Sequence, residues 1–413
     1  MKLSKQVIRE LPKTDLHLHL DGSLRIGTLL ELAREKKIEL PSDSEAGMLE
    51  LVFKERYDNL TEYLKGFQYT VAVLQDPESL ERVSFELMED NIREGVRYIE
   101  VRFAPHLHIR PGLEFKDVLL AVNRGLQRAV DHYNHSVAAI RDGEEPPFAY
   151  GIIVCALRKF EPVYSDYYRQ LYEIHQFSTQ KEVFQMAAIE LARAAVRVRD
   201  EFGIPVVGFD LAGDEMGYPA IDFKPAYDFV HRNFMKKTVH AGEAYGPESI
   251  FQAITELHAD RIGHGNYLFA TDMIRSNDIL DKQDYVERLS QYIADRRITI
   301  EVCLSSNMQT IPTLHRIADH SFGQMIDNRL SCTLCTDNRL VSRTSVSREL
   351  ELAIKHFPFT VHQLKDMLVY GFKRSFFFGP YTRKRRYVRQ NIDYLETVLV
   401  RHQIVDDDLP LED

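Results

Sequence analysis

The chain has 413 residues, a length that suits either two or three domains or one (β/α) barrel with insertions. Hydrophobic residues make up 44% and charged residues 28%, which is typical of a globular protein and excludes a disordered, collagen-like or disulfide-stabilised chain. The net charge of −10 argues against general affinity for nucleic acid or anionic lipid. We therefore expect a small ligand that is not strongly anionic.

The sequence offers no targeting or membrane signal. The first ten residues, MKLSKQVIRE, lack the apolar segment of a secretory signal, and the longest apolar stretch, 149–157, is too short to span a bilayer. Cys332 and Cys335 form a C-x-x-C without the second pair that a zinc ribbon needs, so we expect buried, reduced thiols in strands. These features predict a cytoplasmic protein that binds neither membranes nor nucleic acid, and they leave the oligomeric state open.

Short β-branched runs alternate with long amphipathic stretches, a pattern typical of βα units around a parallel sheet. Eight such runs are present, the number that closes a barrel. We therefore expect an α/β fold, a (β/α)8 TIM barrel, in a single domain over 1–413, with a barrel core at about 12–375 and a C-terminal helical extension at about 376–413. The runs are Asp15 to Leu20, Arg97 to Phe103, Ala149 to Ala156, Val206 to Leu211, Thr238 to Ala241, Arg261 to His264, Thr299 to Leu304 and Cys332 to Asp337.

The connections between the runs differ in length. The first connection, 21–96, holds several helical patterns. In a barrel, a connection of this kind places extra helices over the mouth of the active site. Whether this segment moves as a lid stays open. Segment 132–148, which contains the sequence DGEEPP, is expected to be an exposed polar loop. The basic run 382–389 and the acidic run 406–413 are expected to be exposed to solvent. Helices are expected at Leu24–Glu35, Leu60–Leu74, Ser79–Arg93, Glu248–Leu257 and Asp281–Ala294.

The first run places four polar side chains on one strand face. In Asp15-Leu-His17-Leu-His19-Leu-Asp21 polar residues alternate strictly with leucines. Imidazoles and carboxylates inside a barrel need partners. Two hydrogen-bonded core histidines would satisfy this need, and so would a divalent metal held by both imidazoles.

Other runs also end in polar residues, and active sites of such barrels lie at the C-terminal ends of the strands. The fifth ends in His240 and Glu243, the sixth in His264 and the eighth in Asp337. Three imidazoles and one carboxylate from strands one, five and eight suit zinc with one position left for water. Such a set also accepts cobalt, iron or manganese, so the metal in the cell stays open.

Six motifs occur together in one order. They are DLHLHLDGSL, GFDLAGDE (208–215), HAGE (240–243), RIGHG (261–265), LSSN (304–307) and CTDN (335–338). On these motifs, which span most of the chain, the sequence resembles the adenosine deaminase family of metal-dependent amidohydrolases. Binuclear relatives bridge their metals with a modified lysine after the fourth strand; 209–214 contains no lysine, which favours one metal ion.

The resemblance implies one zinc ion per chain and a hydrolytic reaction. Zinc lowers the pKa of its water from about 15.7 to roughly 7, giving a hydroxide that attacks C6 of adenine. Glu243 resembles the residue that protonates N1, and His264 the one that orients the attacking water. The implied zinc ligands are His17, His19, His240 and Asp337.

The resemblance also implies contacts with the substrate. Asp21 matches the carboxylate near the ribose and Gly213 the backbone N–H that contacts purine N3. Asn338 departs from the family pattern, which more often has a second aspartate contacting N7. Because N7 is an acceptor and an amide always carries N–H donors, Asn338 could keep the contact. We expect weaker roles for 305–307, which brace the site, and for Asp214 and Glu215, whose ordinary interpretation is loop or helix capping.

These residues predict hydrolytic deamination of adenosine and 2′-deoxyadenosine to inosine and ammonia, with a small purine nucleoside as the partner molecule. The alternatives are adenine, N6-methyl-AMP or a modified adenosine, and a non-catalytic nucleoside-binding protein, which the complete set of site residues disfavours. A phosphorylated substrate needs a cationic cradle. The candidates for it are Arg25, Arg56, Arg158 and Arg343.

Overall fold

The computed structural model describes residues 3–358 and 360–404, and its centre is one sheet of eight parallel strands in the order β1 to β8. The expected TIM barrel is confirmed. Backbone bonds close the ring: the N–H of His19 donates to the carbonyl of Asp337 (2.7 Å), and the N–H of Asp337 donates to that of His17 (2.8 Å). The strands are β1 (Lys13–His19), β2 (Val96–Phe103), β3 (Ala149–Leu157), β4 (Val206–Ala212), β5 (Lys236–Ala241), β6 (Arg261–His264), β7 (Thr299–Val302) and β8 (Cys332–Leu334).

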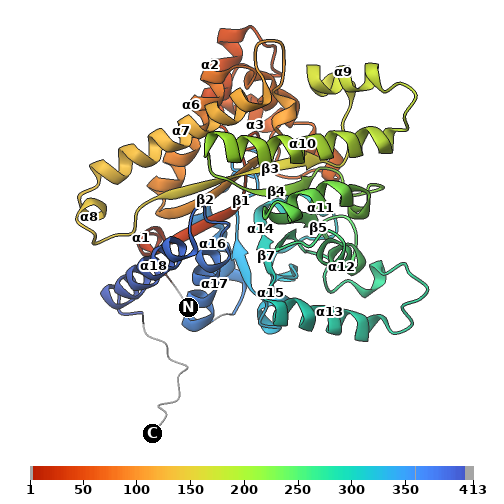
Figure 1. Ribbon diagram of the computed structural model, residues 1–413. Helices are drawn as coiled ribbons and strands as arrows, with labels where there is room; N and C mark the ends of the chain where they lie inside the picture. Colours follow the sequence, from red (N-terminus) through yellow and green to blue (C-terminus); the bar gives the residue numbers. More distant parts are fainter. Residues whose placement is uncertain (1–2, 359, 405–413) are drawn as a thin grey trace.

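Helices surround the strands (Figure 1). Between consecutive strands from β2 to the region after β8 lie α7 (Phe115–Ser136), α8 (Ala138–Arg141), α9 (Asp166–Ile174), α10 (Gln180–Phe202), α11 (Lys224–Arg232), α12 (Pro247–Thr255), α13 (Lys282–Arg296), α14 (Leu304–Thr310), α15 (Phe322–Asp327), α16 (Val346–His356) and α17 (Val361–Arg374). Short 3-10 turns are η1 (Pro105–Leu107), η2 (Pro162–Tyr164), η3 (Ala220–Phe223), η4 (Thr271–Met273) and η5 (Ile317–Asp319). Helix α1 (Lys5–Glu10) precedes the barrel and α18 (Tyr381–Arg401) follows it.

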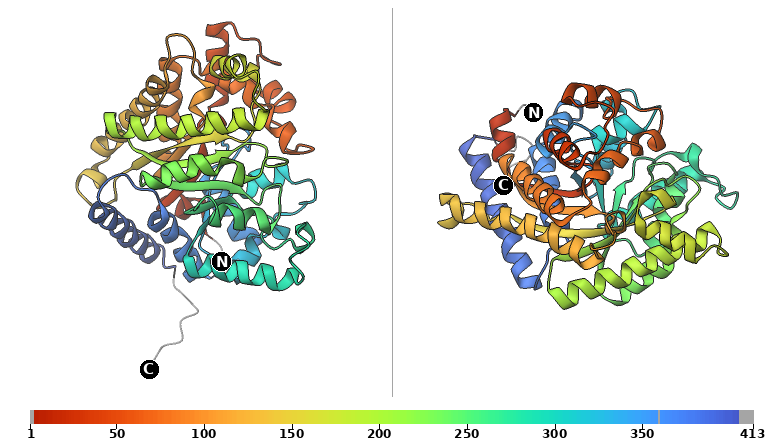
Figure 2. Two further views of the ribbon diagram at one scale, coloured as in Figure 1. Left: turned by 45° about the vertical axis from the view of Figure 1, so that its right-hand side comes forward. Right: turned by 90° about the horizontal axis from the view of Figure 1, so that it is seen from above.

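The long connection after β1 folds into extra helices, as its periodicity predicts. In Figure 1 α2 and α3 lie at one end of the molecule and α17 and α18 toward the other, and the left view of Figure 2 keeps this arrangement. The pattern over 60–74 is divided into two helices rather than one. The inserted helices are α2 (Ile26–Lys36), α3 (Glu45–Leu51), α4 (Leu60–Leu64), α5 (Phe67–Val73) and α6 (Pro77–Arg93).

Capping residues set the ends of the longest helices. The Thr179 hydroxyl and the Glu182 carboxylate form a capping box that starts α10, and Gly203 ends this helix in the left-handed conformation (φ 63°). Asp76 caps α6 by accepting from the N–H of Ser79, with Pro77 in the first turn. The surrounding helices therefore begin and end where their sequences dictate.

The alternation in β1 separates a packed face from a polar one. Leu18 and Leu20 are fully buried in the main hydrophobic core, whereas His17 and Asp15 are buried without belonging to it. All four cysteines are buried free thiols, as predicted. Only Cys155 and Cys332 lie in strands, however, since Cys303 is the N-cap of α14 and Cys335 follows β8. None of the helices in 3–358 and 360–404 combines the length and apolar composition needed to span a bilayer.

Three further local predictions are wrong. The eighth run, expected to reach Asp337, forms a strand only from Cys332 to Leu334. The polar loop expected from residue 132 does not begin there, because α7 continues to Ser136. The Asn134 side chain donates to the carbonyl of Phe148 (3.0 Å) and accepts from the N–H of Phe148 (2.8 Å). These two bonds hold the last turn of the helix. The seventh run does not extend to Leu304, which begins α14. The acidic run 406–413 lies outside the described residues. The division of the chain into a barrel core and a C-terminal extension stays a prediction; helix α18 lies within the predicted extension.

Candidate metal centre and active site

Side chains from three strand ends converge on one point. The Nε2 atoms of His17 and His19 lie 3.4 and 3.5 Å from Oδ1 of Asp337, which follows β8. The Nε2 atoms of His19 and His240 lie 3.2 Å apart. The four predicted ligands therefore meet across the barrel closure, where β1 pairs with the segment after β8.

His264 belongs to the same cluster. One donor atom each from His17, His240, His264 and Asp337 lies within 4.8 Å of the others. His264 has a left-handed backbone (φ 64°) at the end of β6, which turns its ring toward His17 at a centroid distance of 4.8 Å. Geometry alone thus brings five side chains together, and the prediction of four ligands with His264 beside them stays a prediction.

Carboxylates fix the orientation of two imidazoles. Nδ1 of His17 lies 2.9 Å from Oε2 of Glu301, and Nδ1 of His240 lies 3.1 Å from Oδ2 of Asp210. A carboxylate at Nδ1 favours the tautomer that carries its proton there and leaves Nε2 free as a ligand atom. Both Nε2 atoms face the cluster, so these acids orient the rings for metal binding.

The two carboxylates are part of a buried charge network that we did not predict from the sequence. Arg102 donates to Asp210 and to Glu301, each at 2.9 Å. Arg261 donates to Glu301 at 2.6 Å and also bonds Glu100. A signal was present, since each of these residues interrupts an apolar strand run, as in VRYIEVRF and TIEV.

The protonation states suit a cation. Burial lowers the pKa of His19 and of His264 well below the ordinary value, which keeps both rings neutral. Although burial opposes it, the imidazole of His17 lowers the pKa of Asp337. Nε2 of His17 is buried without a hydrogen-bond partner, a costly state that a metal ion would relieve. The neutral imidazoles of His19 and His264, an ionised carboxylate and the unpartnered Nε2 of His17 fit a metal of zinc type.

Glu243 lies beside the cluster as a buried acid. Its Oε1 atom is 3.8 Å from Nε2 of His264. Burial, together with the negative charge of Asp337, raises its pKa well above the ordinary value, which favours the protonated carboxyl. Glu243 does not cap the helix that follows it, because α12 has its N-cap at Gly246 and Glu248 occupies its first turn.

The loop that carries Glu243 is held by Glu215. This carboxylate accepts from the backbone N–H groups of 242, 243, 244 and 245 at 2.7–3.1 Å, and from the Ser249 hydroxyl at 2.5 Å. The interpretation of Glu215 as a loop cap is therefore confirmed. The loop that it caps begins 27 residues further along the chain, at Gly242. Asp214, beside it, caps locally by accepting from the N–H of Met216.

Residues of α14 contact the cluster from a second side. The Ser306 hydroxyl donates to Oδ2 of Asp337 at 2.5 Å. The Asn307 amide lies 3.2 Å from Nδ1 of His264, and its oxygen lies 3.1 Å from Nε2 of His320. Ser305 instead bonds Glu349, away from the ligands. Ser306 and Asn307 thus brace the site from a helix rather than from a strand.

The three predicted substrate residues flank this cluster. Burial raises the pKa of Asp21 to about 7, and its Oδ1 has no hydrogen-bond partner. Gly213, directly after β4, has φ 95°, a conformation that L side chains rarely adopt. The amide of Asn338 donates to the hydroxyl of Tyr63 at 2.8 Å, and its Oδ1 packs so closely on Gly22 that a Cβ there would lie 1.8 Å away. Tyr63, from inserted helix α4, is a contact that the sequence did not reveal.

A parallel eight-stranded barrel with histidines and an aspartate gathered at its strand ends is the architecture of the amidohydrolases. The adenosine deaminase family model matches residues 12–160 and 174–393. The chain belongs to the adenosine deaminase family, and it is a deaminase of adenosine-like purines.

Individual relatives agree with this assignment. Adenosine deaminase 1 of Streptomyces coelicolor is 35% identical over 371 residues, which cover 89% of this chain and 83% of that protein. A solved N6-mAMP deaminase from Arabidopsis has a TM-score of 0.70 and 25% identity, covering 94% of this chain and 99% of that one. An amidohydrolase of Burkholderia ambifaria, solved with bound zinc, shares the fold at a TM-score of 0.74 and 20% identity, over 97% and 96% of the two chains.

Proposed function

We propose that this enzyme is a zinc-dependent deaminase that hydrolyses adenosine and 2′-deoxyadenosine to inosine and 2′-deoxyinosine, releasing ammonia. The observation that carries the proposal is the buried acid Glu243, which lies 3.8 Å from His264 at the edge of the His/Asp cluster and whose pKa burial raises. A purine whose C6 faces this cluster would present N1 to an acid. Few other reactions need this pair of features together.

One zinc ion would be held by His17, His19, His240 and Asp337. When bound, zinc activates a water molecule as a nucleophile at neutral pH by lowering its pKa. The chain contributes the orientation of the ligands, since Glu301 and Asp210 hold His17 and His240 with Nε2 toward the cluster.

Glu243 acts as the general acid. Addition of water at C6 disrupts the aromatic ring, and protonation of N1 makes C6 more electrophilic. A positioned acid contributes about 10² to 10⁴ in rate. The neutral imidazole of His264 can accept a hydrogen bond from the attacking water and hold it on one face of the purine. Glu215 keeps Glu243 in place through the backbone of its loop.

The remaining residues bind the nucleoside. Asp21, with its unpartnered Oδ1, would bond a ribose hydroxyl, and the N–H of Gly213 would donate to N3. Nδ2 of Asn338 carries two hydrogens, of which Tyr63 takes one. The second would donate to N7, so replacement of the usual aspartate preserves the contact.

A phosphorylated substrate such as N6-methyl-AMP is the second candidate, on the similarity to the Arabidopsis N6-mAMP deaminase. The hydrogen bonds disfavour it, because the guanidinium groups of all four arginines considered for a phosphate cradle already donate to protein groups. Arg25 pairs with Asp90 and Glu89. The other three donate to backbone carbonyls: Arg56 to Leu314, Arg158 to His240 and Arg343 to Phe53.

A substrate comparison tests the proposal. The zinc-loaded enzyme is mixed with adenosine, 2′-deoxyadenosine, AMP, N6-methyl-AMP and adenine, and deamination is followed by ultraviolet absorbance and ammonia release. We expect kcat/KM to be highest for the two nucleosides. A higher kcat/KM for N6-methyl-AMP or adenine would overturn the choice of adenosine while keeping the reaction class.

A further inference from the structure

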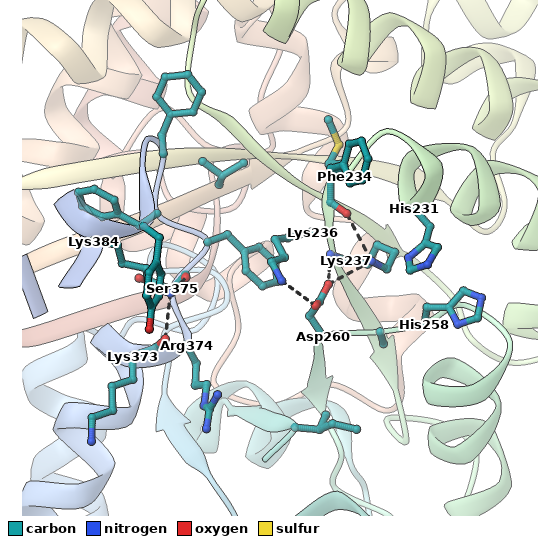
Figure 3. Close-up of a pocket in the computed structure, with 18 of the residues that line it drawn as sticks. His231, Phe234, Lys236, Lys237, His258, Asp260, Lys373, Arg374, Ser375 and Lys384 are labelled. Carbon is teal, nitrogen blue, oxygen red and sulfur yellow. Dashed lines mark hydrogen bonds and ion pairs between the residues drawn. The ribbon is translucent and has the colours of Figure 1, made fainter. Parts of the chain in front are cut away.

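A large cavity opens at the end of the barrel opposite the metal cluster. Its volume is about 1080 Å³, and its walls come from the N-terminal ends of β4 and β5, the segment 373–379 and the first turns of α18 (Figure 3). Lys236, the first residue of β5, lines it, whereas His240 near the other end of β5 lies in the metal cluster. The cavity is therefore separate from the deaminase site.

The lining of this cavity is strongly basic. It includes nine lysine or arginine side chains, and Asp260 is the single carboxylate among the described residues that line it. The protein as a whole has a net charge of −10, so the positive charge is local. Part of it comes from the basic run 382–389, which supplies Lys384 and Arg385 to the wall.

Two carboxylates neutralise only part of this positive charge. Asp200 pairs with Arg199 at 2.7 Å. Asp260 is shared between Lys236 (3.1 Å) and Lys237 (3.2 Å), as Figure 3 shows. Within residues 3–358 and 360–404, no carboxylate forms an ion pair with Arg297 or Arg385. Nε of Arg374 is buried without a hydrogen-bond partner. Buried or crowded cations of this kind leave a field that attracts an anion.

The titration of the neighbouring groups reflects the same crowding. Burial lowers the pKa of Lys384 to about 8, although the negative charge of Glu100 opposes it, and the positive charges of Arg261, Lys236 and Arg374 add to the lowering. Burial and the charge of Arg297 lower the pKa of Arg374. Both groups would regain ordinary basicity beside a negatively charged ligand.

Exposed aromatic rings accompany the cations. Phe234 lines the cavity with 95% of its surface exposed and has a left-handed backbone (φ 56°). Tyr381, 72% exposed, lines it as well. Large apolar rings left open to solvent next to phosphate-binding side chains are the features with which proteins hold a base by stacking.

We propose that this cavity binds a nucleoside di- or triphosphate, with the phosphates on the Lys/Arg wall and the base against Phe234 or Tyr381. Arginine and lysine are the usual partners of phosphate oxygens. Stacking tolerates any base, so the cavity is expected to bind pyrimidine as well as purine nucleotides. The volume suits a ligand of this size.

UTP is the appropriate probe, because it is not a 6-aminopurine and is no substrate of the proposed deaminase. Binding of UTP, tripolyphosphate and uridine to the intact enzyme is measured by calorimetry at low salt. We expect UTP to bind at least tenfold more tightly than tripolyphosphate, and uridine to bind far more weakly than either. Absence of UTP binding, or equal affinity for tripolyphosphate, would overturn the proposal.

Matched variants locate the site. The double variant Arg297→Gln/Arg385→Gln removes two exposed cations of the cavity, and Arg193→Gln/Arg288→Gln removes two exposed arginines on the outer faces of α10 and α13. We expect the first pair to weaken UTP binding at least tenfold and the second to leave it unchanged. Phe234→Gly, at a position whose φ favours glycine, should also weaken UTP binding without lowering Tm. Equal UTP affinity in all variants would place the nucleotide elsewhere and contradict the proposal.

Discussion

Oε2 of Glu301 lies 2.9 Å from Nδ1 of His17, and both side chains are fully buried. Glu301 also accepts hydrogen bonds from Arg102 and Arg261. These bonds hold the carboxylate in the position from which it orients the imidazole of His17. The acid that orients a predicted zinc ligand therefore comes from β7, a strand that supplies none of the predicted ligands itself.

Glu301→Gln should weaken metal binding without abolishing it. The amide can still accept from Nδ1 of His17, but it loses the charge that makes the imidazole a better ligand, and we expect about 10- to 100-fold lower zinc affinity. Competition with a zinc chelator measures this directly. His17→Ala should lose metal and activity together, while Glu287→Gln, exposed on α13, serves as the control. Unchanged zinc affinity in Glu301→Gln would contradict the role of this contact.

Glu243→Gln should separate metal binding from turnover. The glutamine is similar in size but cannot give up a proton, so we expect kcat to fall about 10² to 10⁴-fold with zinc content unchanged. Metal analysis and kcat are measured on the same preparation, with Glu201→Gln on the surface of α10 as control. Loss of zinc in Glu243→Gln would show that this residue acts on the metal site instead.

The raised pKa of Glu243 predicts a pH dependence of definite sign. The folded-state pKa lies above the ordinary value because the carboxyl is buried, so the acid form persists to higher pH than in a free glutamate, and kcat should fall as the pH rises through that raised pKa. Infrared spectroscopy can detect the proton directly: the enzyme at pH 7 should show a protonated carboxyl band that is missing in Glu243→Gln. Identical spectra for the two proteins would mean that Glu243 is ionised and cannot be the acid.

The pair of Tyr63 and Asn338 should affect substrate binding more than chemistry. Tyr63→Phe removes the hydroxyl that holds the amide at 2.8 Å, and a lost hydrogen bond of about 1 kcal/mol raises KM several-fold. Asn338→Asp should be milder than Glu243→Gln, because a protonated carboxyl could still donate to N7. Steady-state kinetics on adenosine test both variants. Loss of all activity in Asn338→Asp would refute the assumption that this position only donates a hydrogen bond.

The sequence was most informative where strand periodicity and chemistry coincide. Alternation in β1 put His17 and His19 on one face, and polar residues at the ends of the fifth, sixth and eighth runs predicted the side chains that the barrel brings together. These inferences need only that parallel strands end at the same edge.

Contacts made by distant segments could not be predicted in this way. Glu215 holds a loop 27 residues away, and Tyr63 reaches Asn338 from an inserted helix; neither pairing leaves a periodic signal. The end of α7 was misjudged because Asn134 bonds the backbone of Phe148, a tertiary contact that overrides the polar composition of the segment.

A zinc titration tests the central claim most directly. The enzyme is stripped of metal with a chelator, zinc is added in steps, and the rate of adenosine conversion to inosine is measured after each addition. The account predicts no activity without metal and a linear rise that stops at one zinc per chain. Full zinc binding without deamination of adenosine, activity in the metal-free protein, or a break at two zinc ions per chain would contradict it.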